Sequence, residues 1–387
     1  MNSLAQGVRA TDLKRTNERV VLDDVRSYGP TTAPEIGKRT GLSKPTVGSA
    51  LRSLQGAGFV RERGLKAGQS GQAPLLWGID ERAGLVLSID VGTQWVRLRL
   101  RSLDGQSRGT FRARSESGSA EDMLHALTKA LSGLLAQEGV AREAIVYAVM
   151  GSPGVVDPVS GRLQHASNLP GWDDVSTMTA LHDLFGPNFL IMKDVYLAAL
   201  GEAEARNTDG AKDFVLLSVG RGVGAAVVRD GQPLSGANGL AGEIAFLPLG
   251  VDPLNPSTPS LRGSLEEAAS ADAMLSSSGL PDVAELVRAA REGHQGAAEA
   301  LARESRLVAY ALTPIILVVD PPLIVLTGSV GLHGGPDFAA SVRHDLGELL
   351  PVRIPSVESS AAGELATLRG AETKGTELAW DMLMTGL

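Results

Sequence analysis

Two segments of the chain repeat one pattern, in which a strand, a glycine-containing turn and a second strand follow each other. The first, GLVLSIDVGTQWVRLRLRSLDG, begins at Gly84 and has a tight turn at residues 90–93. The second, KDFVLLSVGRGVGAAVVRDGQPL, begins at Lys212 and turns through residues 220–224. Helical patterns follow, including an amphipathic one at about 121–138. This duplication predicts two α/β lobes that face each other across a cleft.

The glycines at 220–224 do not form a dinucleotide-binding fingerprint, because that fingerprint needs a helix after the glycines. Here the strand-like AAVVRDG follows them. A glycine-rich hairpin can instead let backbone N–H groups approach a phosphate. Asp90, Gly92 and Thr93 supply a matching turn with a small hydroxyl and free N–H groups. Paired across a cleft, the two turns are typical of an actin-like, sugar-kinase-like ATP site.

The first eighty residues predict a winged helix-turn-helix. Helical patterns cover 17–28, APEIGKRTG and KPTVGSALRSLQGAG, with Gly41 in the turn and Ser43 capping the third helix. FVRERG and PLLWGID read as strands around a polar tip, LKAGQSGQA. Residues 1–80 hold 12 Lys and Arg against 7 Asp and Glu, whereas residues 81–387 hold 24 against 37. A basic N-terminal segment followed by an acidic remainder favours DNA as the partner of residues 1–80.

In a winged helix-turn-helix the third helix enters the major groove, and the wing meets the phosphate backbone or a minor groove. The candidate contacts lie away from the apolar stripe of that helix and on the wing. They are Ser43, Lys44, Thr46, Ser49, Arg52, Arg61, Arg63 and Lys66. A helical protein-interaction module is the alternative, and the basic excess favours DNA binding.

Composition excludes several other classes of protein. At about 150 residues per domain, 387 residues suggest two or three domains. The chain has no cysteine, which excludes disulfides and thiolate chemistry, and its six histidines show no ligand spacing, so we expect no metal. No apolar run reaches the ~18 residues of a membrane span, and the N-terminus lacks an apolar signal segment. We therefore expect a cytoplasmic protein with no membrane partner.

The ordered motifs of the chain resemble those of the ROK family, which contains repressors, uncharacterised frames and sugar kinases, and in particular its branch of transcription regulators. The resemblance covers nearly everything from about residue 15 to the C-terminus. The matching segments are DVGT (90–93), GSPGVVD (151–157), SNLPGW (167–172), KDVYLAALGE (193–202), SVGRGVGAAVV (218–228), GANGLAGEI (236–244), GSLEEAAS (263–270) and VVDPPLIVLTGS (318–329).

The resemblance implies an α/β fold in which a winged helix-turn-helix precedes a two-lobed, actin-like (ribonuclease H-like) domain. The expected boundaries are 1–80 for the DNA-binding domain, 81–205 for the first lobe and 206–387 for the second. The last helix could pack back on the first lobe. As partners we expect a palindromic double-stranded operator, a sugar or sugar-like effector, and a second copy of the chain in a homodimer or homotetramer.

The resemblance also assigns site residues. Asp194 stands at the position of the catalytic base of the sugar kinases, and Glu243 and Glu266 match two sugar-binding carboxylates. Asn168 matches the sugar-side loop, with a plain turn residue as the equal alternative. Lys193 and Phe246 complete the expected ligand site, and Phe246 could stack on a sugar face.

Several departures from the family pattern argue against catalysis. Lys193 replaces an Asn, and Ala245-Phe246 replaces a Gly-His whose His binds both sugar and zinc. With that His and every Cys missing, the family's zinc is expected to be absent. Arg221 replaces a small hydroxylated residue, and it could fill the space of a nucleotide. We therefore expect no cofactor, and a nucleotide site that is only a remnant, formed by Asp90, Gly92, Thr93, Gly220, Arg221 and Gly222.

The leading hypothesis is a repressor whose kinase-like body senses a sugar or related small molecule, with Asp194 as a remnant of the base. The alternative is a working ATP-dependent sugar kinase with an appended DNA-binding domain. A third possibility is a dimerisation scaffold with an empty cleft. The effector, the operator and the oligomeric state are not specified by the sequence.

Overall fold

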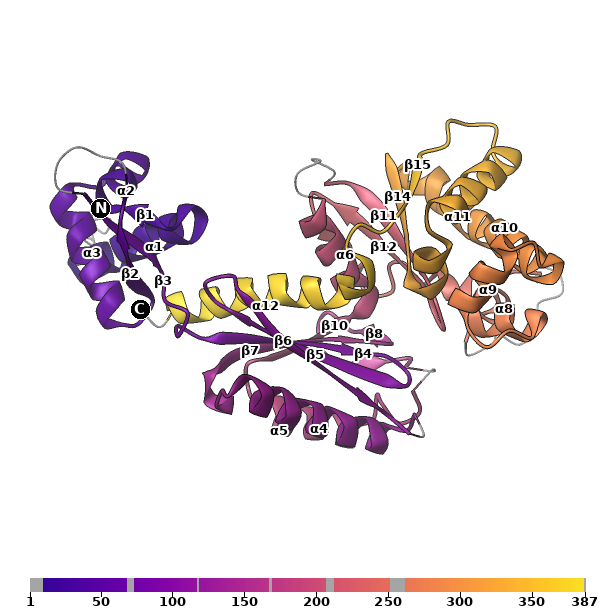
Figure 1. The fold of residues 1–387 in the computed structure, drawn as a ribbon, viewed down its shortest axis with the longest axis horizontal. Helices are drawn as coiled ribbons and strands as arrows, with labels where there is room; N and C mark the ends of the chain where they lie inside the picture. Colours follow the sequence, from indigo (N-terminus) through magenta and orange to yellow (C-terminus); the bar gives the residue numbers. More distant parts are fainter. Residues whose placement is uncertain are drawn as a thin grey trace, which may run out of the picture.

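The computed structural model describes residues 10–67, 73–116, 118–166, 169–206, 212–250 and 262–385, with side chains from Leu13 onward. Along the chain it forms an N-terminal head, a first lobe and a second lobe (Figure 1). The last helix returns from the second lobe to the head, so that the C-terminus lies beside the head. No helix in the described ranges is long and apolar enough to cross a membrane.

The head is a three-helix unit with a small antiparallel sheet, in the order β1-β3-β2. Its elements are α1 (Ala10–Tyr28), β1 (Thr31–Thr32), α2 (Ala33–Thr40), α3 (Lys44–Gly56), β2 (Val60–Leu65) and β3 (Leu75–Ile79). Gly41 ends α2 at φ 75°, a conformation that glycine adopts without strain. The Ser43 hydroxyl then caps α3 by accepting from the Thr46 N–H at 3.3 Å. The first helix begins at Ala10 rather than at the predicted residue 17.

The first lobe has a five-stranded sheet in the order β10-β7-β4-β5-β6. Its strands are β4 (Leu85–Val91), β5 (Trp95–Ser102), β6 (Ser107–Arg114), β7 (Ile145–Ser152) and β10 (Phe189–Lys193), with a separate pair β8 (Val155–Val156) and β9 (Leu163–Gln164). The helices α4 (Ala120–Glu138) and α5 (Val175–Phe185) cover one face of the sheet. The sequence did not predict β6, because its SRGTFRAR is rich in arginine and offers few apolar side chains.

The second lobe has a five-stranded sheet in the order β13-β12-β11-β14-β15, and most of its helices lie on one side of that sheet. Its strands are β11 (Phe214–Val219), β12 (Val223–Arg229), β13 (Gln232–Pro233), β14 (Leu323–Thr327) and β15 (Ser356–Ser359). Its helices are α7 (Ser264–Ala269), α8 (Ala271–Ser278), α9 (Val283–Arg291), α10 (Gln295–Val319) and α11 (Gly328–Leu349).

Two helices connect these parts. Helix α6 (Asp194–Ala205) contacts β7 and β10 of the first lobe and β11, β12 and β13 of the second. Helix α12 (Ala366–Thr385) packs along α6 and against β4 and β7. The two helices touch backbone to backbone, since a Cβ on Gly201 would lie 2.0 Å from the Ala366 carbonyl oxygen and one on Gly370 would lie 1.8 Å from that of Leu197. Any rearrangement of α6 must therefore be accommodated by α12.

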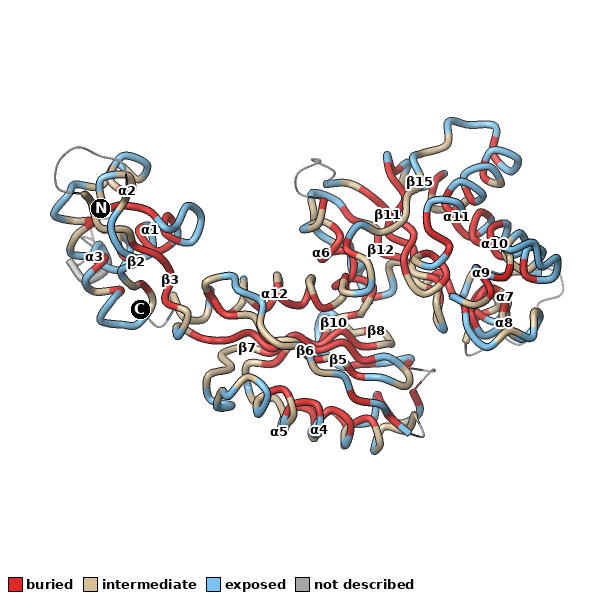
Figure 2. The backbone as a smooth tube through the Cα atoms, viewed as in Figure 1, coloured by how far each residue is buried: buried red, intermediate tan, exposed pale blue. Residues whose placement is uncertain are grey.

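The far end of α12 belongs to the core of the head. Trp380 is 1% exposed, and it packs with buried residues of α1, α3 and β3 as well as with Val86 of the first lobe. Its ring centroid lies 6.2 Å from that of Phe59, and the Arg26 guanidinium lies 5.0 Å from the Trp380 ring. Figure 2 shows buried residues along α12 and through both sheets. The apolar core of the head therefore includes Trp380 of α12 and, from the first lobe, Val86 and Leu103, while the first lobe has a separate core of its own.

A buried carboxyl in the second lobe gives a pH-dependent prediction. Glu304 of α10 is fully buried, and neither of its carboxyl oxygens has a hydrogen-bond partner among the described residues. Burial raises the pKa of Glu304 from its ordinary 4.5 to about 8. The folded protein therefore holds the Glu304 proton more tightly than the unfolded chain does. This contributes fully to the free energy of unfolding below pH 4.5, and the contribution is lost as the pH rises toward 8. The full loss is on the order of 5 kcal/mol.

We expect Glu304→Gln to reduce the fall in the free energy of unfolding between pH 5 and pH 8.5, because glutamine cannot ionise. Urea titrations at several pH values measure this difference. Glu299→Gln, an exposed position of the same helix, is the control and should keep the wild-type profile. An unchanged profile in Glu304→Gln would contradict the buried, unpaired carboxyl.

Candidate functional site

A cleft of about 650 Å³ lies between the two lobes, and it brings together predicted residues from distant parts of the sequence. The first lobe contributes the turn after β4 and the end of β10, and the second contributes the β11–β12 turn and the segment around Glu243. The predicted residues that line it are Gly92, Thr93, Lys193, Asp194, Gly220, Arg221, Gly222, Glu243, Phe246 and Glu266. Asn168 lies outside the described residues.

The inner end of the cleft is formed where β10 passes into α6. Lys193 is buried there, and its Nζ lies 2.5 Å from Glu243 Oε1 and 5.2 Å from the ring centroid of Tyr196. The carboxylate that the family resemblance assigns to sugar binding is therefore already paired with a cation. A sugar would have to share Glu243 with Lys193.

Asp194 follows Lys193 at the first position of α6, and its Oδ1 accepts from the Val195 N–H at 2.7 Å. Burial, and after it the neighbouring Asp90 carboxylate, raise the pKa of Asp194 to about 6. Asp90 itself is buried and paired with Arg97 at 2.5 Å. Asp194 is thus mainly ionised at pH 7 and retains the capacity to accept a proton.

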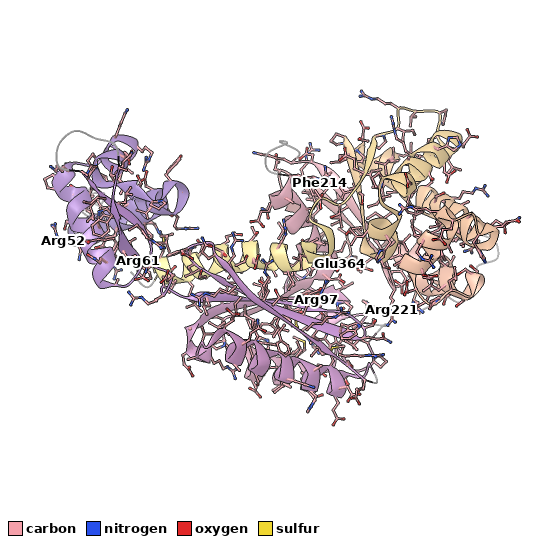
Figure 3. All side chains as sticks on the ribbon, viewed as in Figure 1. Arg52, Arg61, Arg97, Phe214, Arg221 and Glu364 are labelled. Atoms are coloured by element: carbon pink, nitrogen blue, oxygen red, sulfur yellow. The ribbon has the colours of Figure 1, made fainter. Side chains whose placement is uncertain are left out.

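The outer end of the cleft is bridged by an arginine. The Arg221 Nη1 donates to the Thr93 hydroxyl at 2.9 Å, which joins the β11–β12 turn of one lobe to the turn after β4 of the other. Figure 3 shows Arg221 between the lobes, near the end of the first sheet. These two turns are the ones that the sequence assigns to nucleotide phosphates. The guanidinium occupies the space between them.

Two further predicted residues have different surroundings. Glu266 is buried, its Oε2 accepts from the Val223 N–H at 3.0 Å, and its Oε1 lies 3.3 Å from Arg262 Nε. It therefore supports the glycine-rich hairpin, in addition to lining the cleft. Phe246 is 45% exposed on the cleft wall, where an aromatic face is open to a ligand.

Among the cleft-lining residues that sequence reasoning missed are Trp95, Arg112 and His165. The Arg112 guanidinium lies 3.8 Å from the centroid of the Trp95 ring, a distance at which cation and ring attract each other. Arg97 and Arg112 are opposite each other in the β5–β6 pair, which places both on one face of the sheet. Only recognition of β6 as a strand could have brought Arg112 to the cleft.

A second functional surface is the outer face of α3 in the head. Lys44, Ser49 and Arg52 are exposed, and none of them has an ion pair with a described residue. Thr46 is half-buried and its hydroxyl lies 2.8 Å from that of Ser43, so both belong to the helix cap. Figure 3 shows Arg52 on the side of the head away from the lobes.

The predicted wing contacts Arg61, Arg63 and Lys66 all have partners within the chain. The Nη1 and Nη2 nitrogens of Arg61 both donate to the Glu81 carboxylate at 3.0 Å. Arg63 donates to the Ile79 carbonyl at 2.8 Å and to Asp104 at 3.1 Å. Lys66 is paired with Glu35 of α2. These partners lie in α2, in β3 and in the turns that follow β3 and β5, so the base of the wing makes its contacts within the chain.

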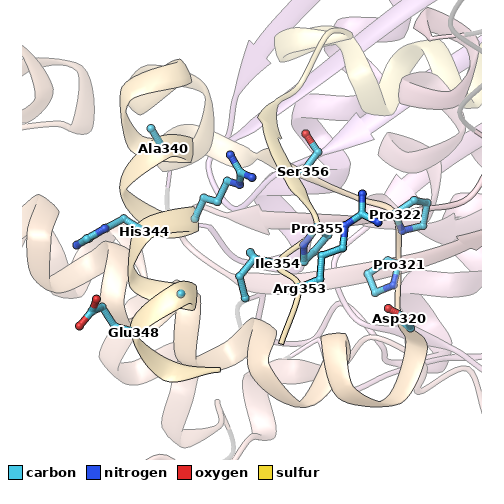
Figure 4. A pocket seen from close by; sticks show the side chains of 12 residues that line it. Asp320, Pro321, Pro322, Ala340, His344, Glu348, Arg353, Ile354, Pro355 and Ser356 are labelled. Atoms are coloured by element: carbon cyan, nitrogen blue, oxygen red, sulfur yellow. The ribbon is translucent and has the colours of Figure 1, made fainter. Parts of the chain in front are cut away.

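A larger hollow, of about 1100 Å³, lies on the second lobe between α11 and the segment that leads into β15 (Figure 4). Arg343 and Arg353 line it, and most of its lining residues are exposed. It contains none of the predicted site residues. In the described part of the chain, no group of three His, Cys, Asp or Glu side chains could hold a metal ion.

Known proteins with similar sequences and structures include both regulators and kinases. The profile described as the ROK family matches residues 86–372. A xylose repressor from Caldicellulosiruptor bescii is 24% identical over 84% of this chain and 86% of that protein. A kanosamine kinase from Amycolatopsis mediterranei is 31% identical over 74% of this chain and 94% of the kinase.

Among solved structures, a ROK family transcriptional regulator described as a homolog of the E. coli MLC protein has a TM-score of 0.71 at 19% identity. The match covers 97% of this chain and 98% of that one. The likeness confirms the predicted fold class of two α/β lobes of the actin-like kind.

Proposed function

Because the chain belongs to the ROK family, we propose that it is a DNA-binding transcriptional repressor whose two-lobed body binds a sugar or sugar-like effector. The observation that carries the proposal is the exposed outer face of α3, whose Lys44 and Arg52 have no ion pair with a described residue, in a head whose core includes Trp380 of α12. A regulator that binds the bacterial chromosome acts in the cytoplasm. The names of the repressor relatives support the same role.

The proposed mechanism starts at the cleft. An effector bound between the lobes contacts Lys193 and Asp194, which lie at the N-terminal end of α6. A change in lobe closure then moves α6, the glycine contact passes the movement to α12, and α12 reorients the head. An effector can shift this equilibrium only by its difference in affinity for the two states, with a coupling of typically ~1–3 kcal/mol.

The proposed partners are a palindromic operator and further copies of the chain. A dimer with two-fold symmetry presents two α3 helices to half-sites about one helical turn, ~34 Å, apart. A tetramer would bind two such operators. Sedimentation of the protein with and without operator separates the two assemblies.

The direct test is selection of genomic fragments by the full-length protein, followed by fluorescence anisotropy on the selected site. We expect Arg52→Ala to weaken operator binding by about tenfold or more, the usual cost of one lost base contact. We expect Lys44→Ala, if it removes one phosphate contact, to reduce the slope of log K against log salt by about one. Lys129→Ala removes the same charge from an exposed position of α4 and serves as the control. Wild-type binding without sequence selectivity at physiological salt would refute the proposal.

A working kinase is the second candidate, and the ionised Asp194 at neutral pH favours it. We propose that phosphoryl transfer does not occur, since Arg221 occupies the space between the two phosphate turns and Lys193 is paired with Glu243. A coupled assay for ADP release over a panel of sugars measures this. Turnover that disappears in Asp194→Asn would establish the kinase instead.

A further inference from the structure

We propose that the effector carries a negative charge, and that Arg112 and Arg221 bind its charged group at the end of the cleft beside Thr93. The chemical class is a monosaccharide with a phosphate ester or a carboxylate. This inference rests on the proposed role of the cleft in effector binding. It concerns residues of β6 and of the β11–β12 turn, outside the inner end where Lys193 and Glu243 lie.

Arg112 is held in place by an aromatic ring, and its charge has no ion-pair partner among the described residues. Its guanidinium stacks over Trp95 at 3.8 Å, and the Arg114 guanidinium lies 5.6 Å from the centroid of the same ring. Neither arginine has an ion pair with a described residue. Stacking leaves the N–H groups at the edge of the guanidinium plane available, and their fork matches the geometry of a phosphate or carboxylate.

Arg221 is the second cation at this end of the cleft. Its Nη1 is bonded to a neutral hydroxyl, that of Thr93, rather than to a carboxylate. Its one ion pair in the described part of the chain is with Asp272, at 3.9 Å, and both side chains are about half exposed. Such a pair contributes little. Both Arg112 and Arg221 line the cleft.

Most of the other charged groups that line the cleft have charged partners among the described residues, and the Asp194 carboxylate accepts from the Val195 N–H. Lys193 is paired with Glu243, and Arg262 is paired with Glu266. Asp282 also lines the cleft, and its Oδ1 caps α9 by accepting from the Glu285 N–H at 2.8 Å. Arg112 and Arg221 are therefore the cleft-lining cations that a neutral sugar would leave without a close charged partner among the described residues. An anionic group at that position would receive charge-assisted hydrogen bonds from both lobes.

The size of the cleft and the Arg221 bridge limit what this anion can be. A volume of about 650 Å³ is ample for a monosaccharide derivative. A nucleotide would need the space between the phosphate turns, which the bond from Arg221 to Thr93 crosses. The anion therefore arrives as part of the sugar.

Titration calorimetry on the full-length protein tests the inference with matched ligands. The probes are glucose, N-acetylglucosamine and xylose, each beside its phosphate monoester and a corresponding sugar acid, with inorganic phosphate and ATP as further arms. We expect at least one charged ligand to bind about tenfold or more tightly than its neutral parent, because hydrogen bonds to charged groups contribute more than neutral ones. Preference for the phosphate or for the acid identifies which anion is used.

Arg112→Gln should then remove about tenfold of the affinity for the charged ligand and leave that for its neutral parent unchanged. Arg108→Gln, on the same strand but outside the cleft lining, loses the same charge and should bind like the wild type. The inference is overturned by equal affinities for charged and neutral sugars, by equal loss of both in Arg112→Gln, by tighter binding of ATP alone, or by no binding of any probe.

Operator binding by the same protein separates this inference from the proposed function. If only neutral sugars weaken or strengthen operator binding, the proposed sugar-responsive repressor stands and the proposed anion site is wrong. Failure of the wild-type protein to bind any operator selectively would eliminate the repressor, even where calorimetry shows the charged ligand bound.

Discussion

Replacing Trp380 by alanine is expected to destabilise the head by about 3–5 kcal/mol, the usual cost of removing a buried tryptophan. Trp380 lies on the last helix, yet its ring is buried against Phe59 and Arg26 of the head. Its loss leaves a cavity at the junction of the head and the first lobe. We expect calorimetry to show a separate, earlier transition for the head, and anisotropy to show weakened operator binding.

Met382→Ala is the matched control, because Met382 lies on the same helix, is half-buried and is not part of the apolar core of the head. It should leave the melting profile close to that of the wild type. A Trp380→Ala protein that melts in one transition at the wild-type temperature would show that the head does not depend on α12.

Gly370→Ala is the second substitution with a large expected effect. By helix propensity alone, alanine would stabilise α12 by about 1 kcal/mol. The structure predicts the opposite sign, because the new Cβ would lie 1.8 Å from the carbonyl oxygen of Leu197 and 3.0 Å from the N–H nitrogen of Gly201. Since backbone atoms cannot yield as a side chain can, α6 and α12 must separate, at a cost of about 3 kcal/mol or more.

Urea unfolding of Gly370→Ala beside Gly347→Ala measures this difference. A Cβ on Gly347, within α11, would meet nothing within 4 Å, so this substitution should be neutral or slightly stabilising. A Gly370→Ala protein as stable as the wild type would contradict the close contact of α6 with α12. A protein that folds but no longer responds to effector would localise the coupling at this contact.

The sequence predicted the elements that carry local signals. Gly41 and Ser43 determine where α2 ends and α3 begins, and both features are visible in a short segment. The strand–turn–strand units were also predicted, because alternation and glycines mark them. In contrast, β6 was missed because its exposed edge position allows arginines where a buried strand would have apolar residues.

The candidate site also has features that the sequence predicted and features that it did not. Motifs in family order brought Thr93, Lys193, Asp194, Arg221 and Glu243 to one cleft. The partners of the charged groups were not predictable, since the bonds of Arg63 to Asp104 and of Arg221 to Thr93 depend on how separate elements pack. Local pattern selected residues that line one cleft, and tertiary contacts decide which of the charges there are paired.

The contribution of α12 to the head limits how this chain can be recombined with its relatives. A hybrid that carries only the first eighty residues would expose the apolar surface that Trp380 covers, because it would lack α12. A transplantable DNA-binding unit must therefore include both ends of the polypeptide, residues 10–80 together with 366–385. Evolution of new operator specificity in such proteins has to keep the two ends compatible.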